Sequence, residues 1–312
     1  MAPLVSVIIP TFNRRSRVLR ALDSVERQDY PALEVVVVDD ASTDGTAEAI
    51  AARQSSVPVR VIGLPTNFGP GEARNAGVAG AAGKYVAFLD SDDHWLPGKL
   101  RRQVEAAEQA VHKLGVLVYS RTRILRRHEA IVRPHKAIAP LEAVADYLFA
   151  NAGYLAQSAM LVPTAVARAV PFRDMAIHED WDWYIRLQAA GAAFLMLPEV
   201  HRVVDDRGIE GRRSQAPAHV SLSILDSWKS SISSHAYLGL RARIAPLLRS
   251  SAPGRAMHFI VEAYRRGAID HWQFCALTGR LAHPQLRDVA YRLRGAWATM
   301  TGKLSTSAEK AR

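Results

Sequence analysis

Short apolar runs alternate with segments of helical periodicity over the first 120 residues. The runs are nearly continuous rather than alternately polar, which is typical of strands that are covered on both faces. The predicted strands cover residues 4–9, 33–38, 57–64, 84–89 and 115–120, and the predicted helices cover 16–28, 43–54, 71–82 and 97–111. This order predicts an α/β, Rossmann-like fold with a mostly parallel sheet and helices on both of its faces.

Beyond residue 120 the alternation is looser. The pattern predicts a hairpin or extended loop over 122–133, helices over 141–150 and 179–190, and strands over 158–162 and 194–197. The polar, glycine-punctuated stretch 205–214 predicts a loop that can serve as a lid. Short helices interrupted near Pro246, Pro253 and Pro284 follow. We expect one domain over 1–215, with halves at about 1–120 and 121–215, and a C-terminal α-helical region over 216–312.

Composition narrows the class of protein. Of the 312 residues, 49% are hydrophobic and 22% charged, which excludes wholesale disorder. The single cysteine, Cys275, excludes an internal disulfide and a four-cysteine zinc site, and suits a reducing compartment. No apolar run reaches the roughly 20 residues that span a bilayer. The N-terminus lacks a basic region followed by a cleavable apolar stretch, so the expected location is the cytoplasm.

The positive charge is concentrated in the last third of the chain. The formal net charge is +10, and residues 216–312 contain 14 basic but 5 acidic side chains. This pattern is typical of a solvated arginine-rich face, or of a basic helical surface in peripheral contact with an anionic membrane. It also allows a homodimer interface. No nucleic-acid recognition module is visible, so we expect no nucleic-acid partner.

Unusual polar residues follow three of the first four predicted strands. These are Pro10-Thr11-Phe12-Asn13, Asp39-Asp40 and Asp90-Ser91-Asp92-Asp93. Because ligands of open α/β sheets collect at the carboxyl ends of the strands, we expect these groups to share one crevice. So many carboxylates together favour a bound cation, and hard oxygen ligands favour Mg²⁺ or Mn²⁺. Such an ion keeps positions open for phosphate oxygens, which makes a nucleoside diphosphate a natural ligand. Taken singly, each group can equally be a helix cap or a chance pattern.

The complete set of motifs resembles a known family. In order along the chain stand VSVIIPTFN from residue 5, EVVVVDDASTDG from 34, GEARNAG from 71, YVAFLDSDD from 85 and HEDWD from 178. Together they are similar to the inverting family 2 glycosyltransferases of the GT-A fold, over about residues 4–200. The resemblance implies a nucleotide-sugar half at about 1–120 and an acceptor half at about 121–215.

The resemblance also implies donor-binding roles. The turn containing Pro10, Thr11 and Asn13 would hold the base and ribose. Asp40, in preference to Asp39, would accept from the N3–H of a pyrimidine in a charge-assisted hydrogen bond. The diphosphate would be reached by Arg74 and Asn75, and the ribose, the sugar or a metal-bound water by Asp90 with Ser91. The implied donor is a UDP-sugar, with dTDP as the second choice because its ring carries the same N–H.

The metal ligand and the catalytic base are implied in the same way. Asp92 would bind the metal, with Asp93 as the second choice. His201 is a third candidate, although its spacing departs from the family pattern of arginine, one residue, histidine. Asp180, or alternatively Glu179, would take the proton from the acceptor hydroxyl, which then attacks the anomeric carbon and inverts its configuration. Both carboxylates lie at a predicted helix start, where the helix dipole favours the ionised form.

Two other functions remain open at this point. A catalytically weak nucleotide-sugar-binding or scaffold protein would bind the same ligands without turnover. A nucleotidyltransferase would usually carry a glycine-rich basic loop near the N-terminus, which the sequence after Pro10 lacks. The pattern does not choose the acceptor, which can be a glycan, a lipid-linked glycan, a peptide or a small natural product, and it leaves the sugar open.

Overall fold

The computed structural model describes residues 1–110, 115–127, 129–206 and 217–282. The chain divides into two compact units, residues 1–144 with 153–212, and residues 145–152 with 213–312. The second unit thus includes residues 145–152, which the sequence pattern assigns to the first domain. The boundary predicted near 215 and most of the predicted lid fall within 207–216, outside the described residues.

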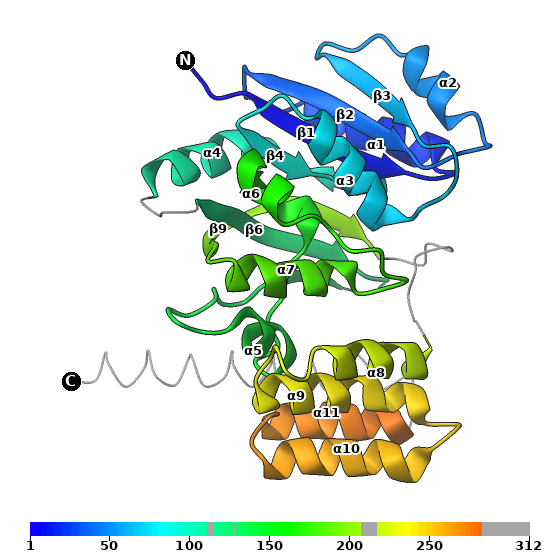
Figure 1. The fold of residues 1–312 in the computed structure, drawn as a ribbon, viewed down its shortest axis with the longest axis vertical. Coiled ribbons are helices and arrows are strands. Elements are labelled where there is room, and N and C mark those ends of the chain that lie inside the picture. Colours follow the sequence, from blue (N-terminus) through cyan, green and yellow to red (C-terminus); the bar gives the residue numbers. More distant parts are fainter. Residues whose placement is uncertain (111–114, 128, 207–216, 283–312) are drawn as a thin grey trace. The chain divides into compact units, whose positions relative to one another are not determined.

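One nine-stranded sheet forms the centre of the first unit (Figure 1). Its strands lie in the order β3-β2-β1-β4-β8-β6-β9-β5, and β7 pairs with β6. They are β1 (Val5–Thr11), β2 (Leu33–Asp39), β3 (Val59–Gly63), β4 (Tyr85–Phe88), β5 (Asp93–Trp95), β6 (Val116–Leu125), β7 (Ala130–Arg133), β8 (Met160–Pro163) and β9 (Ala193–Asp205).

The sheet is parallel in one half and mixed in the other. β1 pairs in parallel with β2 and β4, and β2 with β3, as predicted. β8 runs antiparallel to both of its neighbours, β4 and β6, and β6 continues into a hairpin with β7. The expectation of a mostly parallel sheet therefore holds for the first four strands, whereas beyond them the parallel pair β6–β9 lies among antiparallel pairs. Because β2 and β4 flank β1 on opposite sides, the carboxyl ends of β1 and β4 form a switch point, where ligands of such sheets bind.

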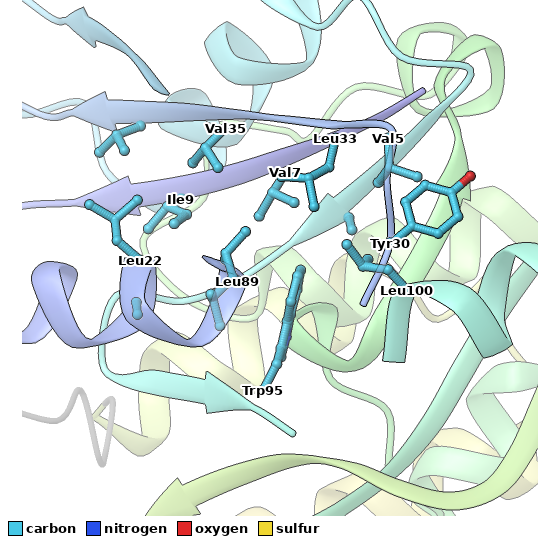
Figure 2. Packing of buried hydrophobic residues seen from close by; sticks show 14 of the residues in the cluster. Val5, Val7, Ile9, Leu22, Tyr30, Leu33, Val35, Leu89, Trp95 and Leu100 are labelled. Atoms are coloured by element: carbon cyan, nitrogen blue, oxygen red, sulfur yellow. The ribbon is translucent and has the colours of Figure 1, made fainter. Parts of the chain in front are cut away.

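Helices cover both faces of this sheet. They are α1 (Arg15–Glu26), α2 (Thr46–Ala51), α3 (Pro70–Gly80), α4 (Lys99–Gln109), α6 (Thr164–Ala169) and α7 (Glu179–Ala189), with a short 3₁₀ turn, η1 (Gln157–Ala159). On one face the β1 side chains Val5, Val7 and Ile9 pack with Leu22 of α1 and Leu100 of α4 (Figure 2). On the other face, Ala73 of α3 packs against the intervening residues of β2. The nearly unbroken apolar runs are explained by this burial on both sides.

α3 approaches β1 closely. A Cβ atom at Gly77 would lie 2.4 Å from Cγ2 of Ile8, a distance that requires the neighbouring atoms to move. Glycine at this position lets the helix backbone rest directly on the strand. The close contact fixes the start of α3, and Arg74 one turn before Gly77, relative to the end of β1.

The second unit is helical. It contains α8 (Ala218–Ser227), α9 (Ser234–Ile244), the 3₁₀ turn η2 (Ala245–Leu248), α10 (Pro253–Arg265) and α11 (His271–Ala282), packed around most of α5 (Val144–Phe149). The ring of Phe149 stacks on Trp228 with centroids 6.2 Å apart, and a Cβ at Gly239 would lie 2.6 Å from the Phe149 carbonyl oxygen. These contacts explain why α5 belongs to this unit. Within the described residues, no helix is both long and apolar enough to cross a membrane.

Candidate active site

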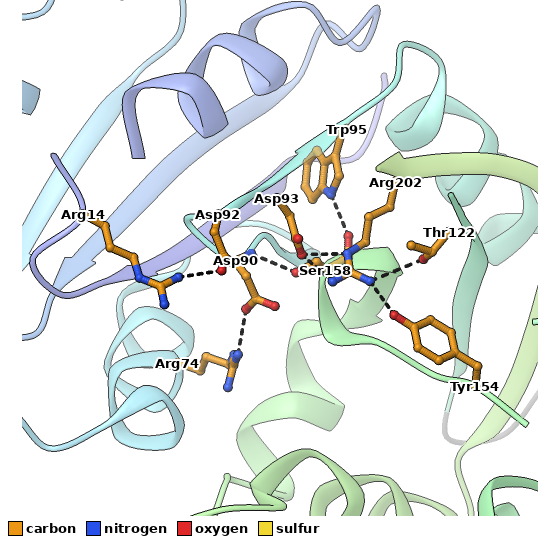
Figure 3. Close-up of polar contacts among 10 residues, drawn as sticks. All are labelled: Arg14, Arg74, Asp90, Asp92, Asp93, Trp95, Thr122, Tyr154, Ser158 and Arg202. Carbon is orange, nitrogen blue, oxygen red and sulfur yellow. Dashed lines mark hydrogen bonds and ion pairs between the residues drawn. The ribbon is translucent and has the colours of Figure 1, made fainter. Parts of the chain in front are cut away.

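Three arginines from distant parts of the chain reach the acidic run that follows β4 (Figure 3). Arg74 Nη2 lies 2.7 Å from Asp90 Oδ1, Arg14 Nη1 lies 2.8 Å from Asp92 Oδ2, and Arg202 Nη2 lies 2.5 Å from Asp93 Oδ2. Each of the three aspartates thus has its own cationic partner. The carboxylates are crowded together as predicted, and their negative charge is balanced by three arginines of the same chain.

Arg74 joins the acidic run to the start of α7. Its guanidinium contacts Asp90 and also Glu179 Oε1, at 3.3 Å, and its side chain is 6% exposed. Burial would raise the pKa of Asp90, but the attraction of Arg74 and Arg202 outweighs burial and holds that pKa at about 2. The Asp90 backbone N–H donates to Ser158 Oγ at 2.9 Å. Arg74 therefore joins the acidic run, 16 residues further along the chain, to the start of α7, 105 residues further along.

The Asp93 side chain is buried and paired with an arginine, which leaves it poorly placed to bind a ligand. Its side chain is 1% exposed and accepts from Arg202, which also donates to the hydroxyl of Tyr154 at 2.9 Å. Burial raises the pKa of Asp93 to about 6, and the nearby carboxylates of Asp90 and Asp92 act in the same direction. The second-choice metal ligand is thus held in a buried ion pair. Trp95, 1% exposed, belongs to the core and donates to the Ser158 carbonyl.

His201 faces away from the acidic run. Successive residues of a strand point to opposite faces, and here Arg202 faces Asp93. The His201 imidazole is buried near Lys99 and Glu199, and its Nδ1 has no hydrogen-bond partner among the described residues. Burial, reinforced by Lys99, lowers its pKa to about 4. The imidazole of His201 thus lies on the side of β9 opposite to Arg202 and Asp93.

Asp40 fixes a loop rather than presenting a free carboxylate. Its two oxygens accept from the backbone N–H groups of Phe68 and Gly69, each at 2.8 Å, just before α3. Asp39 accepts from the Ser42 N–H at 3.2 Å through Oδ1. Asp39 also lies opposite Thr11 in the β1–β2 register, so both side chains share the face that carries α1. Both oxygens of Asp40 thus accept from backbone N–H groups, whereas the hydrogen bond to Asp39 involves Oδ1.

The turn after β1 is tied to the loop after β2. The Asn13 backbone N–H donates to Ser42 Oγ at 2.9 Å, and its side-chain oxygen accepts from the Thr43 N–H at 2.8 Å. Asn13 has φ 50°, a conformation that asparagine adopts more readily than most residues. Pro10 is buried within β1, and the Thr11 hydroxyl, also buried, has no hydrogen-bond partner in the described part of the chain.

Asn75 is held by hydrogen bonds within the protein, and Ser91 is buried. The Asn75 side chain accepts from the Phe172 N–H at 2.8 Å and donates to the Phe172 carbonyl at 2.9 Å. It therefore anchors α3 to the segment before α7, and its amide is occupied where a diphosphate contact was expected. Ser91 is 4% exposed, between Asp90 and Asp92.

Asp180 has the properties of a carboxylate that can take up a proton near neutral pH. Burial, together with the charge of Glu179, raises its pKa to about 7, although the Trp181 N–H donates to its Oδ1 at 2.9 Å. Its environment includes Arg74 and Asp90, which also influence its pKa. The predicted base thus lies in the same site as the acidic run.

Two other side chains of α7, those of Asp182 and Tyr184, are buried. Asp182, 3% exposed, pairs with Arg186 at 2.6 Å and with Arg173 at 3.3 Å. Tyr184 lies one turn after Asp180 and is fully buried. Its hydroxyl has no hydrogen-bond partner in the described residues, and burial, reinforced by Asp180, raises its pKa well above the ordinary value.

The acidic run offers a partly accessible carboxylate, that of Asp92, to a divalent cation. Within 1–110, 115–127, 129–206 and 217–282, no group of three or more His, Cys, Asp or Glu side chains is arranged to hold a metal ion. Mg²⁺ and similar ions are commonly held by one or two carboxylates plus substrate phosphates and water. Asp92 is 11% exposed, compared with 1% for Asp93, so it is the carboxylate better placed for that role.

An α/β sheet with an acidic run at its switch point, joined to a helix that begins with a carboxylate pair, defines a GT-A-type enzyme. Residues 6–161 match the family described as Glycosyl transferase family 2. The chain belongs to this family and is a glycosyltransferase. The amylovoran biosynthesis glycosyltransferase AmsB of Erwinia amylovora is 30% identical over 201 residues, which are 62% of this chain and 67% of AmsB.

Other relatives are matched over shorter stretches. The succinoglycan biosynthesis protein ExoO of Rhizobium meliloti is 42% identical over 36% of this chain and 32% of its own length. Among solved structures, Staphylococcus aureus TarS in complex with UDP-GlcNAc is 20% identical with a TM-score of 0.60, covering 93% of this chain and 89% of that chain. The mannosyltransferase PcManGT of Pyrobaculum calidifontis, in complex with GDP-Man and Mn²⁺, is 20% identical with a TM-score of 0.57, covering 99% and 87%. These likenesses confirm the GT-A fold.

Sequence reasoning missed the residues that neutralise the site. Arg14 and Arg202 are absent from the predicted set, and both contact its acidic run. Strand alternation could have indicated Arg202, because neighbouring residues of a strand point to opposite faces of the sheet. His201 and Arg202 cannot therefore both face the same side. Arg14 follows the predicted turn directly, but nothing in the local pattern indicates that its side chain reaches Asp92.

Proposed function

We propose that this glycosyltransferase is inverting and metal-dependent, and that it moves a sugar from a UDP- or dTDP-sugar to a hydroxyl of a glycan acceptor. The observation that carries the proposal is the double contact of Arg74, 2.7 Å from Asp90 and 3.3 Å from Glu179. It holds the carboxylate pair at the start of α7 against the loop where a nucleotide diphosphate would bind. A donor-binding loop and a proton acceptor in one site are the two parts that direct displacement requires.

Asp180 would act as the general base. A base is most effective when its pKa lies near the working pH, and the pKa of Asp180 is about 7. In the proposed step the ionised carboxylate takes the proton of the acceptor hydroxyl. The oxygen forms a bond to the anomeric carbon as the bond to the diphosphate breaks, and the nucleoside diphosphate leaves with the electron pair. A single displacement from the opposite face inverts the anomeric configuration.

The nucleotide would bind at the turn after β1. We assign the base contact to Asp39, because both Asp40 oxygens already accept from backbone N–H groups. Thr11, opposite Asp39, has a buried hydroxyl without a partner in the described residues, which is available to a ligand. A carboxylate facing the imide N–H of uracil or thymine would favour these bases. Similar folds hold UDP-GlcNAc in TarS and GDP-Man in PcManGT, so the base needs a direct test.

A divalent cation, Mg²⁺ or Mn²⁺, would be held by Asp92. When bound, such an ion stabilises negative charge on the departing diphosphate. Arg74 would keep Asp90 ionised and in place beside it. The Mn²⁺ in the PcManGT structure supports the choice of a divalent ion.

The acceptor assignment rests on the relatives. AmsB, ExoO and TuaG are named for the biosynthesis of amylovoran, succinoglycan and teichuronic acid, and TarS is named as a poly(ribitol-phosphate) N-acetylglucosaminyltransferase. A growing glycan, free or lipid-linked, is therefore the acceptor that we propose. The helical unit would serve it through membrane contact or a homodimer, and the cytoplasmic location stays a prediction.

A thermal-shift series combined with turnover tests the proposal. UDP, dTDP and GDP are each added with and without Mn²⁺ to the wild type and to Asp180→Asn. A ligand present at about 100 times its Kd stabilises the folded state by about 2.7 kcal/mol. We expect UDP or dTDP with Mn²⁺ to raise the midpoint in both proteins, and donor-sugar turnover in the wild type alone. A shift with GDP alone would refute the donor assignment. Shifts without wild-type turnover over a panel of glycan acceptors would favour a binding protein.

A further inference from the structure

The three arginines of the acidic run differ in how firmly they are held. Arg74 and Arg202 have side chains 6% and 7% exposed, and each has further partners, Glu179 for Arg74 and Tyr154 for Arg202. Arg14 is 26% exposed and pairs with Asp92 at the rim. Arg14, the most exposed of the three, is therefore the arginine whose departure from its carboxylate costs least in buried unpaired charge.

Arg14 also belongs to the turn that would carry the nucleotide. It follows Asn13, whose side chain and backbone N–H are tied to the loop after β2, and it immediately precedes α1. Figure 3 shows its guanidinium at the Asp92 carboxylate, while that of Arg74 lies at Asp90. The main chain at Arg14 is thus anchored, while its long side chain spans the gap between the base-binding turn and the candidate metal ligand.

We propose that Arg14 is a positioning residue that exchanges partners when the donor binds. In the ligand-free enzyme its guanidinium occupies Asp92. When a divalent cation and a diphosphate arrive together, the cation takes the carboxylate, and the guanidinium moves to the phosphate oxygens, which suit its planar, multiply donating geometry. This inference rests on the proposed metal and nucleotide sites and concerns how they are coupled.

The exchange makes metal and nucleotide binding cooperative. A cation alone must compete with Arg14 and leaves the guanidinium without an anionic partner. A cation with diphosphate supplies that partner. By linkage, the factor by which UDP tightens Mn²⁺ binding equals the factor by which Mn²⁺ tightens UDP binding. Arg14 would therefore discourage unproductive metal binding and favour the metal–nucleotide pair.

The test is a titration of bound Mn²⁺ by electron paramagnetic resonance, with and without UDP, without any turnover measurement. The variants are Arg14→Gln, Arg14→Lys and the control Arg15→Gln, which makes the same change of charge one residue further along the chain. Because an ion pair at a partly exposed position contributes modestly, we expect Arg14→Gln to tighten binding of Mn²⁺ alone by roughly 2- to 5-fold. Loss of a charge-assisted bond to phosphate should weaken UDP binding in the presence of Mn²⁺ by about tenfold. Arg14→Lys should restore much of the coupling, and Arg15→Gln should resemble the wild type.

The outcomes separate this inference from the proposed function. If Mn²⁺ with UDP binds the wild type, and Arg14→Gln leaves the coupling factor unchanged or weakens binding of Mn²⁺ alone, the exchange is refuted while the metal site stands. An equal effect of Arg15→Gln would reduce the role of Arg14 to general charge and would also refute it. The proposed metal site itself fails if Mn²⁺ binds neither the wild type nor Arg14→Gln, with or without UDP. It also fails if Asp92→Asn binds Mn²⁺ as the wild type does.

Discussion

Asp180→Asn should abolish transfer and at the same time stabilise the fold. The pKa of Asp180 is about 7 against an ordinary value of 3.8, mainly because the half-buried carboxylate is shielded from water, and next because of the charge of Glu179. One pKa unit corresponds to about 1.4 kcal/mol, so holding this side chain ionised costs the folded state up to about 4 kcal/mol. Asparagine has the same shape, keeps the oxygen that accepts from Trp181 and removes the charge.

The stabilisation should depend on pH in one direction. Below about pH 4 the carboxyl is protonated in both the folded and unfolded states, so the substitution changes little. As pH rises from about 4 to 7, the unfolded state loses the proton first, and the wild type loses stability relative to the variant. The difference in the free energy of unfolding should therefore grow with pH and level off above pH 7, at up to about 4 kcal/mol.

Although Asp180→Asn should stabilise the fold, it should lower the rate of sugar transfer. Loss of a general base typically costs about 10²- to 10⁴-fold in rate. In the wild type, kcat/KM should fall about tenfold per pH unit below pH 7, because protonated Asp180 cannot accept the proton of the acceptor. Nucleotide binding by the variant should survive.

Asp182→Asn is the matched control on the same helix. The chemical change is identical, but Asp182 is held in a buried ion pair with Arg186. Breaking such a pair should destabilise the fold by about 3–5 kcal/mol. Urea unfolding of the wild type and both variants at pH 5 and pH 8, together with turnover, measures all of these quantities. If Asp180→Asn is less stable than the wild type at pH 8, or retains near-normal turnover, the burial argument or the base assignment is wrong.

Three further substitutions test the packing and the nucleotide turn. Gly77→Ala should lower the free energy of unfolding by about 1–3 kcal/mol, because the added methyl group would lie 2.4 Å from a side-chain carbon of Ile8; an unchanged chemical-denaturation midpoint would contradict the close packing. Tyr184→Phe should be neutral or stabilising, because it removes a buried hydroxyl without a partner in the described residues, and a clear loss of stability would show that the hydroxyl is satisfied. Asp39→Asn should weaken UDP binding about tenfold by calorimetry with little effect on folding, whereas Asp40→Asn should mainly destabilise the fold; the reverse result would return the base contact to Asp40.

Local pattern was sufficient for β1, β2 and β4, but it missed β5 and the second half of β9, which carry Asp93 and Arg202. The continuous apolar runs at 4–9, 33–38 and 84–89 correspond to β1, β2 and β4, because burial on both faces requires apolar side chains at every position. A parallel arrangement of these strands follows from the intervening helices, and it brings their polar ends to one edge. The presence of an acidic run, and its place at the end of β4, were therefore readable in the sequence.

Only the tertiary structure decided what each polar side chain contacts. Arg202 reaches Asp93 across 109 residues, and a local pattern cannot indicate which charges will pair over such a separation. The same holds for Asp40, whose oxygens are taken by a loop that begins 28 residues later. Residues 145–152 read as part of the first domain because their helical periodicity is ordinary, yet they pack with the second unit. Hydrophobic periodicity is a local property that survives in the sequence, whereas the pairing and burial of charges depend on which distant segments the fold brings together.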